Sequence, residues 1–263
     1  MAFQISEDAD LMKVLEVRDL DKSFISNKKG SVVHATDHIS FSLEEGEFLG
    51  IVGESGCGKS TVAKLLMGLH CPDGGEILIH GKPCIYPYSR EVYKDIQMVF
   101  QMPKDSFDPR RTIGKCLESV LKNFGTPLAQ CHDRSIVLLE QVGLNESFLG
   151  KYPHEMSGGE CQRAAIARAM AANPGILICD EITSALDVSV QAQIVDLIMG
   201  LKESGKLSVI FISHDLALVQ GLCSRIIVMN NGVIVEEGDG GQIINNPRHE
   251  YTKKLMSSVL TVE

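Results

Sequence analysis

Long apolar runs are absent from this sequence of 263 residues, although 44% of its residues are hydrophobic. A helix that crosses a membrane needs about 20 consecutive apolar residues, and no stretch of the chain approaches that length. The first residues include Glu7, Asp8 and Asp10 and lack the basic and then apolar order of a secretory signal. We therefore expect that the chain is not itself a membrane channel, and that any role at a membrane depends on partner proteins.

Paired cysteines and an excess of basic charge are also absent. The eight cysteines are dispersed, with no C-x-x-C pair and no histidine at the spacing of a zinc site. This arrangement favours a protein of the reducing cytosol over a disulfide framework or a metal cluster. The formal net charge is −9, so the composition gives no sign of a nucleic-acid-binding surface, and we expect no nucleic-acid partner.

A glycine-rich loop at residues 53–60 is the strongest signal in the chain. It fits the pattern G-x-x-x-x-G-K-[ST] at every fixed position, between an apolar run and a helix-like stretch, which argues against an ordinary turn with a surface lysine. Its glycines let backbone N–H groups wrap around an anion, and the following helix adds its positive end. Lys59 would supply charge for the β- and γ-phosphates and Ser60 would bind Mg²⁺. The expected nucleotide-binding residues here are Gly53, Glu54, Ser55, Gly56, Cys57, Gly58, Lys59, Ser60 and Thr61.

Short apolar stretches alternate with helical patterns along much of the chain. This alternation predicts an α/β fold with a parallel sheet whose two faces are covered. Asn230, Asn231 and Gly232 predict a hairpin, and residues 27–30 predict an earlier turn between two strands. The expected strands include residues 14–17, 32–35, 39–43, 48–52, 77–79, 96–100, 176–179, 209–212, 226–229 and 233–235.

Residues 102–172 differ from the rest of the chain, because they show helical patterns and no convincing strand pattern. Apolar residues recur at helical spacing over 133–142 and 161–171, and the segments 190–201 and 240–259 also read as helical. The predicted organisation has a flexible acidic leader at 1–12 and a single domain at 13–263. Within that domain, the helical segment 102–172 interrupts a lobe formed by 13–101 and 173–263.

Two carboxylates follow the apolar run at residues 176–179. A buried strand there would place Asp180 and Glu181 at its carboxyl end, where α/β sheets bind ligands. Asp180 could hold Mg²⁺ through its water shell, and Glu181 could orient an attacking water or accept its proton. The alternative is an acidic strand end that faces solvent, which the nearby phosphate loop makes less attractive.

Three further residues give weaker signals. His214 follows the apolar run at 209–212 and could donate a hydrogen bond to a γ-phosphate oxygen, although a structural histidine would look the same. Gln101 follows another apolar run and could reach Mg²⁺ or the attacking water. Phe24 is most simply a core aromatic residue, and it could also stack on a purine.

A second anion cradle is predicted at residues 157–160. Ser157 is a candidate N-cap, and Gly158 and Gly159 would expose N–H groups at the start of a helix. One nucleotide does not need two cradles from a single chain, so each cradle could serve a partner chain in a head-to-tail dimer. The alternative is an ordinary capped turn, because Ser-Gly-Gly is common in loops.

Taken together, these motifs resemble the nucleotide-binding subunit of ABC transporters over residues 14–260. The loop at 53–60 is similar to that family's Walker A motif, and Asp180 with Glu181 to the end of Walker B. The resemblance implies a P-loop ABC-type ATPase with a parallel-sheet core, an N-terminal antiparallel β subdomain and a helical subdomain. It also implies that ATP and Mg²⁺ are bound. The other positions that match are Phe24 (the adenine-stacking aromatic), Gln101 (the Q-loop), Ser157, Gly158 and Gly159 (the signature, which ends in Glu160), Ser184 to Asp187 (the D-loop) and His214 (the switch histidine). On this basis Gln101 also joins Ser60 and Asp180 as an expected metal ligand.

A finer resemblance connects the chain to the peptide and nickel importer branch of that family. It rests on residues 53–60, 160–163, 178–181, 187–193 and the tail at 247–255. Importers of this branch use two permeases, two related ATPase subunits and an external binding protein. The resemblance therefore implies a peripheral protein at the cytoplasmic face of the cell membrane. The cargo stays open between oligopeptides, dipeptides, nickel and metal chelates; the second ATPase is a sister subunit, which we favour, or another copy of this chain.

Some positions depart from the branch pattern. Glu160 replaces the usual Gln, which predicts weaker ATP affinity because a carboxylate would lie near phosphate. Met102 replaces the commoner Asp after Gln101, and Glu250 replaces the usual Pro. Two other functions compete with an importer subunit. A soluble ABC ATPase acting on DNA or ribosomes would show a second cassette, a coiled-coil insertion or a basic face, and a non-hydrolysing regulatory module would not need Glu181.

Overall fold

The computed structural model describes residues 12–25, 31–184, 186–203 and 207–259. The predicted leader, apart from Met12, and the predicted turn at 27–30 lie outside the described residues. Among the helices of the described segments, none combines the length and the apolar character that crossing a membrane requires.

A six-stranded sheet forms the centre of the molecule. Its strands lie in the order β10-β9-β3-β8-β7-β6, and the five from β9 to β6 are parallel, which confirms the predicted parallel core. Every residue of β3, β7 and β8 is buried, because helices or another sheet cover both faces. The bounds are β3 Phe48–Val52, β6 Ile96–Val99, β7 Ile176–Asp180, β8 Ser208–Ser213, β9 Arg225–Asn230 and β10 Val233–Asp239.

A second, antiparallel sheet packs over one face of the first. Its order is β2-β1-β4-β5, with β1 at Lys13–Ile25, β2 at Val32–Glu44, β4 at Gly74–Ile79 and β5 at Lys82–Pro83. The sequence predicted a short first strand and two separate strands over 32–43, which is wrong, because β1 and β2 are each one long strand. Both contain register shifts, and Asp19 and His38 there adopt positive φ and pair through their side chains at 2.9 Å. Such bulges interrupt the alternation that marks a strand in sequence.

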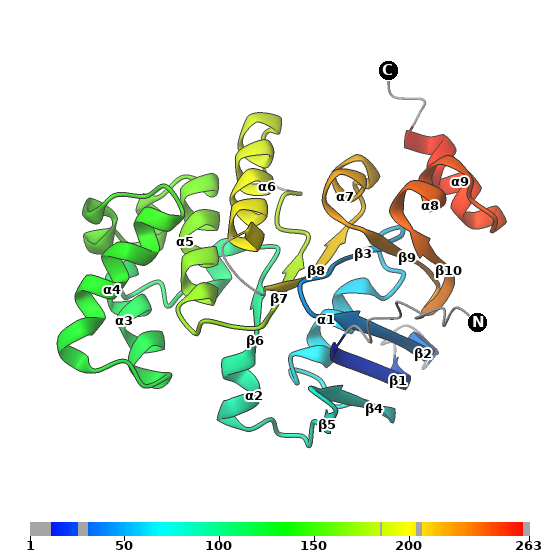
Figure 1. Cartoon of the computed structure of the whole chain (residues 1–263), viewed down its shortest axis with the longest axis horizontal. Coiled ribbons are helices and arrows are strands. Elements are labelled where there is room, and N and C mark those ends of the chain that lie inside the picture. Colours follow the sequence, from blue (N-terminus) through cyan, green and yellow to red (C-terminus); the bar gives the residue numbers. More distant parts are fainter. Residues whose placement is uncertain (1–11, 26–30, 185, 204–206, 260–263) are drawn as a thin grey trace, which may run out of the picture.

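Residues 102–172, all of which are described, contain helices and no strand. In Figure 1 the helices α3, α4 and α5 stand together to one side of the central sheet, beyond its edge strand β6. The helix α3 was not predicted from the sequence, although Thr112 caps it by accepting a hydrogen bond from the Lys115 N–H at 3.4 Å. The bounds are α3 Ile113–Asn123, α4 Leu128–Gln141, α5 Gly158–Met170, and the 3₁₀ turns η1 Pro103–Ser106, η2 Glu146–Gly150 and η3 Pro153–Glu155.

The remaining helices follow the strands. The tail was predicted as one helical segment over 240–259, and it is two helices, α8 at Gly240–Asn245 and α9 at Glu250–Val259. Pro247 lies between them, and proline disfavours helical backbone at the residue before it. The other helices are α1 Lys59–Leu66, α2 Arg90–Asp95, α6 Val188–Glu203 and α7 Leu216–Leu222.

Two hydrophobic cores lie on opposite faces of the parallel sheet. Leu49 and Ile51 of β3 pack toward α1 and the antiparallel sheet, whereas Phe48 and Val52 pack toward α5, α6 and α7. Successive strand residues point to opposite faces, so one short strand serves both cores. Because both faces are filled, the open part of the sheet is the edge where the strands end, and the loops that leave it are held by buried strands.

Candidate nucleotide-binding site

The predicted site residues follow the ends of four neighbouring parallel strands. β3, β8, β7 and β6 are adjacent in that order, and each ends one or two residues before a predicted site residue. The loop at 53–60 follows β3, His214 follows β8, Glu181 follows β7, and Gln101 lies two residues after β6. Parallel strands bring their carboxyl ends to one edge, which is where α/β sheets bind ligands.

The phosphate loop needs glycine at two positions for steric reasons. Gly53 has φ +152° and Gly58 has φ +114°. A Cβ atom on Gly53 would lie 2.3 Å from the Met229 carbonyl oxygen, and one on Gly58 would lie 2.1 Å from the Ala35 carbonyl oxygen. The loop is therefore pressed against the backbone of β9 and β2, and a side chain at either position would force it away.

Lys59 lies inside the loop that precedes it. Its side chain is 3% exposed, and its Nζ donates hydrogen bonds to the carbonyl oxygens of Gly53 at 2.7 Å and Glu54 at 3.0 Å. The N–H groups of Ser55 and Gly56 donate to no residue that the structure describes. An ammonium surrounded by available amides and followed by a helix N-terminus is an arrangement that binds phosphate.

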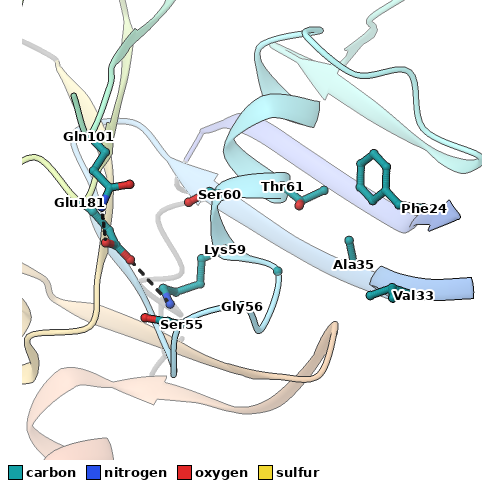
Figure 2. Close-up of a pocket in the computed structure, with 11 residues that line it drawn as sticks. Phe24, Val33, Ala35, Ser55, Gly56, Lys59, Ser60, Thr61, Gln101 and Glu181 are labelled. Carbon is teal, nitrogen blue, oxygen red and sulfur yellow. Dashed lines mark hydrogen bonds and ion pairs between the residues drawn. The ribbon is translucent and has the colours of Figure 1, made fainter. Parts of the chain in front are cut away.

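A cavity of about 500 Å³ opens in front of this loop. Figure 2 shows Phe24, Val33 and Ala35 at one end and Gln101 and Glu181 at the other, with the loop between them. Phe24 is 37% exposed and lines the cavity, so it is available to a ligand and is not a core residue. The complete lining is Phe24, Val33, Ala35, Ser55, Gly56, Gly58, Lys59, Ser60, Thr61, Gln101 and Glu181.

Glu181 lies close to three other predicted site residues. Its Oε2 accepts a hydrogen bond from Gln101 Nε2 at 3.1 Å and lies 3.7 Å from His214 Nδ1. Its Oε1 lies 4.0 Å from Lys59 Nζ. Its backbone has φ +47°, a left-handed conformation that is costly for a residue with a side chain, and its N–H donates to the Ile212 carbonyl oxygen at 3.0 Å.

Asp180 lies beneath Ser60 at the end of β7. Its side chain is nearly buried, and its Oδ1 accepts a hydrogen bond from Ser60 Oγ at 2.9 Å. Burial raises the pKa of this carboxyl, the Ser60 hydrogen bond opposes that rise, and the negative charge of Glu181 adds to it. Burial disfavours the ionised form of this carboxyl, and a nearby cation would stabilise its negative charge.

The remaining predicted residues line a second cavity of about 390 Å³. Ser157 caps α5 as predicted, and it forms a reciprocal pair with Glu160: the Glu160 N–H donates to Ser157 Oγ at 3.3 Å, and the Ser157 N–H donates to Glu160 Oε2 at 2.8 Å. That hydrogen bond from Ser157 lowers the pKa of Glu160, so the carboxylate is charged at neutral pH. Gly158, Gly159 and Asp187 line the same cavity.

The predicted residues thus fall into two groups on one chain. Phe24, Gln101 and Glu181 lie with the phosphate loop, whereas Ser157 to Glu160 and Asp187 line the second cavity. Sequence reasoning missed Val33 and Ala35, which are short side chains with no chemical signal of their own. It also missed three residues that line the second cavity, Arg163, Val190 and Gln193, whereas Leu186 of the expected D-loop lines it too.

A phosphate loop with a buried lysine, an acidic strand end beside it and a capped glycine turn at a second cavity define a P-loop ATPase. Residues 36–184 match the model of the family described as ABC transporter. The chain belongs to the ABC transporter family. It is an ATP-binding and ATP-hydrolysing subunit of an ABC importer, as predicted.

Similar proteins cover nearly the whole chain. The oligopeptide transport ATP-binding protein OppF of Salmonella typhimurium is 43% identical over 258 residues, which are 96% of this chain and 77% of that protein. The oligopeptide transport ATP-binding protein AppF of Bacillus subtilis is 44% identical over 261 residues, 94% of this chain and 78% of that one. A dimeric structure of the ATP-binding cassette MJ0796, in a post-hydrolysis state with ADP and Pi, superposes with a TM-score of 0.76 at 29% identity. It covers 86% of this chain and 98% of that one.

The buried charge of Asp180 leads to a prediction about stability and pH. Because its pKa is raised in the folded protein, ionisation of Asp180 costs stability; the cost begins as the pH rises above the ordinary Asp value of about 3.9 and is complete above the raised pKa. We therefore expect Asp180→Asn to raise the free energy of unfolding at pH 7.5, measured by urea denaturation without divalent cations. The gain should shrink as the pH approaches about 4.

Asp187→Asn provides the matched comparison. The pKa of Asp187 is lowered, mainly by the hydrogen bond from the Val190 N–H, so its charge is favourable in the folded protein and its removal should reduce stability at pH 7.5. An Asp180→Asn variant that is less stable than the wild type at pH 7.5 would contradict the assignment of a costly buried charge.

Proposed function

We propose that this chain hydrolyses MgATP in a site completed by a second ATPase subunit, and that it thereby drives uptake of peptides through membrane permeases. The observation that carries the catalytic part is the position of Glu181, within 4.0 Å of Lys59 and hydrogen-bonded to Gln101 at the edge of the 500 Å³ cavity. Phosphoryl transfer needs little covalent help from the protein, so positioning and charge do most of the catalysis.

Each side chain at the cavity has a proposed role. Lys59 stabilises negative charge on the β- and γ-phosphates, and the amides of the loop hold their oxygens. Glu181 orients the attacking water and receives its proton, and Gln101 holds the Glu181 carboxylate in place through the 3.1 Å hydrogen bond. His214, whose ring is half exposed and lies 3.7 Å from Glu181, donates to a γ-phosphate oxygen. Phe24 stacks on the adenine at the far end of the cavity.

The proposed cation is Mg²⁺, and its protein ligands are few. Ser60 and Asp180 already share a hydrogen bond of 2.9 Å, so both oxygens face one small space beside the phosphate loop. Among the described residues there is no group of three His, Cys, Asp or Glu side chains that could hold a metal alone. That suits Mg²⁺, which in nucleotide sites takes one or two protein ligands together with phosphate oxygens and water. Mg²⁺ bound there, with Gln101 nearby, would offset phosphate charge.

The second cavity supports a dimer in which two chains share each ATP. Ser157, Gly158 and Gly159 line that cavity at the start of α5, and they belong to a different pocket from the phosphate loop of the same chain. In a head-to-tail pair each chain's glycine turn would cover the other chain's ATP. ATP would then favour the closed pair, and hydrolysis would release it. Glu160 keeps a negative charge at that surface, which would weaken ATP binding across the dimer.

The cargo and the remaining partners are proposed from the relatives. OppF and AppF, at 43% and 44% identity, are named for oligopeptide transport, which favours peptides over nickel or a metal chelate. Two permeases would bind the helical segment 102–172, within which Met102, Lys104 and Asp105 are exposed. An external binding protein would deliver the cargo. The chain would thus act as a peripheral protein at the cytoplasmic face of the membrane, beside a sister ATPase or a second copy. In this proposal, 13–101 with 173–263 form the ATP-binding lobe.

The catalytic role of Glu181 can be tested by one isosteric change. Glu181→Gln keeps the size of the side chain and removes the basic carboxylate, so we expect ATP turnover to fall by about 100-fold or more. ATP affinity should be retained, and a stable ATP-bound dimer should accumulate in size-exclusion chromatography. Wild-type turnover in this variant would remove Glu181 from the catalytic role.

Lys59→Ala is the contrasting control for that experiment. It removes a charged donor to phosphate, so we expect ATP affinity itself to fall by about tenfold or more. Unchanged ATP binding by Lys59→Ala would contradict the assignment of the phosphate loop. The two variants therefore separate loss of chemistry from loss of binding.

The importer assignment predicts which proteins accompany the chain. A tagged full-length chain, isolated from gently solubilised membranes, should bring with it two multi-span proteins and a second ATPase subunit. Peptides and Ni²⁺ should then be compared as ligands of the associated binding protein, and we expect peptides to bind. Recovery of ribosomes or DNA, or of no partner from a chain that binds ATP, would favour the soluble alternatives.

A further inference from the structure

The tail of the chain reaches the phosphate loop through one tyrosine. Tyr251 lies in the first turn of α9, and its hydroxyl oxygen accepts a hydrogen bond from the Glu54 N–H at 3.0 Å, although 197 residues separate them in sequence. The proposed function uses neither Tyr251 nor the tail segment 247–255. Figure 1 shows α9 beside α8 and β10, at the C-terminal end of the described chain.

Several contacts fix the position of the helix that carries Tyr251. The carboxylate of Glu236 in β10 accepts hydrogen bonds from the N–H groups of Arg248 at 2.8 Å and His249 at 3.0 Å. His249 Nδ1 accepts a hydrogen bond from the Tyr251 N–H at 3.1 Å. Thr252 is completely buried, and the next turns of α9 bury Leu255 and Met256 in the core. The tyrosine is therefore held by the body of the protein and approaches the loop from outside the ATP cavity.

The hydrogen bond acts on a peptide plane that also holds Lys59. The Glu54 N–H and the Gly53 carbonyl belong to the same peptide unit, and in a trans peptide they point in opposite directions. Tyr251 holds the N–H side, and the carbonyl side accepts a hydrogen bond from Lys59 Nζ at 2.7 Å. Rotation of that plane would break both contacts together, so the tyrosine hydroxyl restrains the carbonyl to which the lysine ammonium is bound.

The amides of Ser55 and Gly56 in the loop are left for phosphate. Ser55 and Gly56 line the ATP cavity and Glu54 does not, so the one amide that Tyr251 uses is not among those that face the ligand. The contact thus restrains the loop without occupying an anion-binding group. It is the kind of support from outside the site that keeps a binding group in its productive geometry.

We propose that Tyr251 is a positioning residue of the ATP site, whose hydroxyl fixes the Gly53–Glu54 peptide plane and, through it, the Lys59 ammonium. The inference rests on ATP binding at the phosphate loop. Lys59 contacts phosphate both before and during hydrolysis, so loss of the restraint weakens binding of ground state and transition state alike. That pattern raises KM for ATP and leaves kcat nearly unchanged.

Tyr251→Phe tests the proposal because it keeps the ring and removes only the hydroxyl. In the full-length chain, purified with its partner subunits, we expect the Kd and KM for ATP to rise about fivefold while kcat changes by less than twofold. Tyr88→Phe is the matched control, since its hydroxyl donates to the Leu65 carbonyl oxygen at 3.2 Å near the other end of α1. Its KM should equal that of the wild type.

Distinct outcomes would overturn the proposal. An unchanged KM in Tyr251→Phe, or a lower melting temperature with unchanged ATP affinity, would leave the tyrosine with a structural role only. If Tyr251→Phe fails to fold, Glu236→Gln decides, because it loosens the 248–249 anchor without touching the loop and should raise KM in the same direction; an unchanged KM there refutes the proposal. A wild-type chain that binds no ATP would overturn the site assignment and this inference together, whereas normal wild-type binding with an unaffected Tyr251→Phe overturns the inference alone.

Discussion

The structure depends on a parallel sheet that is covered on both faces. β3 is buried at all five positions, with Phe48 facing one core and Leu49 the other, so it is held rigidly up to the residue where the phosphate loop begins. The same holds for β7 and β8, which end at Asp180 and Ser213. With helices and a second sheet closing the faces, the strand ends are the place where polar groups can gather and meet a ligand. The burial of the strands therefore also determines where the site lies.

Much of the site could be predicted because each part is local in sequence. An apolar run followed directly by Gly53, by Asp180 and Glu181, or closely by His214, carries both the strand and the polar group that leaves it. The parallel arrangement then brings those groups to a common edge without knowledge of the strand order. Ser157 was equally local, since its cap and its partner Glu160 are three residues apart. For these elements, sequence pattern and structure agree because short-range signals decide them.

The parts that could not be predicted depend on contacts between distant residues. The two long strands β1 and β2 were not predicted, because the extra residues of the bulges at Asp19 and His38 break the alternation of apolar and polar positions. Val33 and Ala35 line the cavity in front of the phosphate loop only because β2 passes that loop, and the identity of neither residue indicates this position. Tyr251 is 197 residues from the amide it binds. Such contacts form only in the folded chain, and no local sequence pattern indicates them.

The backbone of Glu181 has a consequence for how this protein can change. Its φ of +47° lies in the region that suits glycine or asparagine, and a glutamate there costs about 1–2 kcal/mol of folding free energy. Replacement by glycine or asparagine would relax the chain at the end of β7 and at the same time remove the carboxylate from the cavity. If Glu181 has the catalytic role proposed above, selection for stability and selection for activity act on this position in opposite directions. A screen for thermal stability alone would then favour replacements of Glu181 that lack the carboxylate.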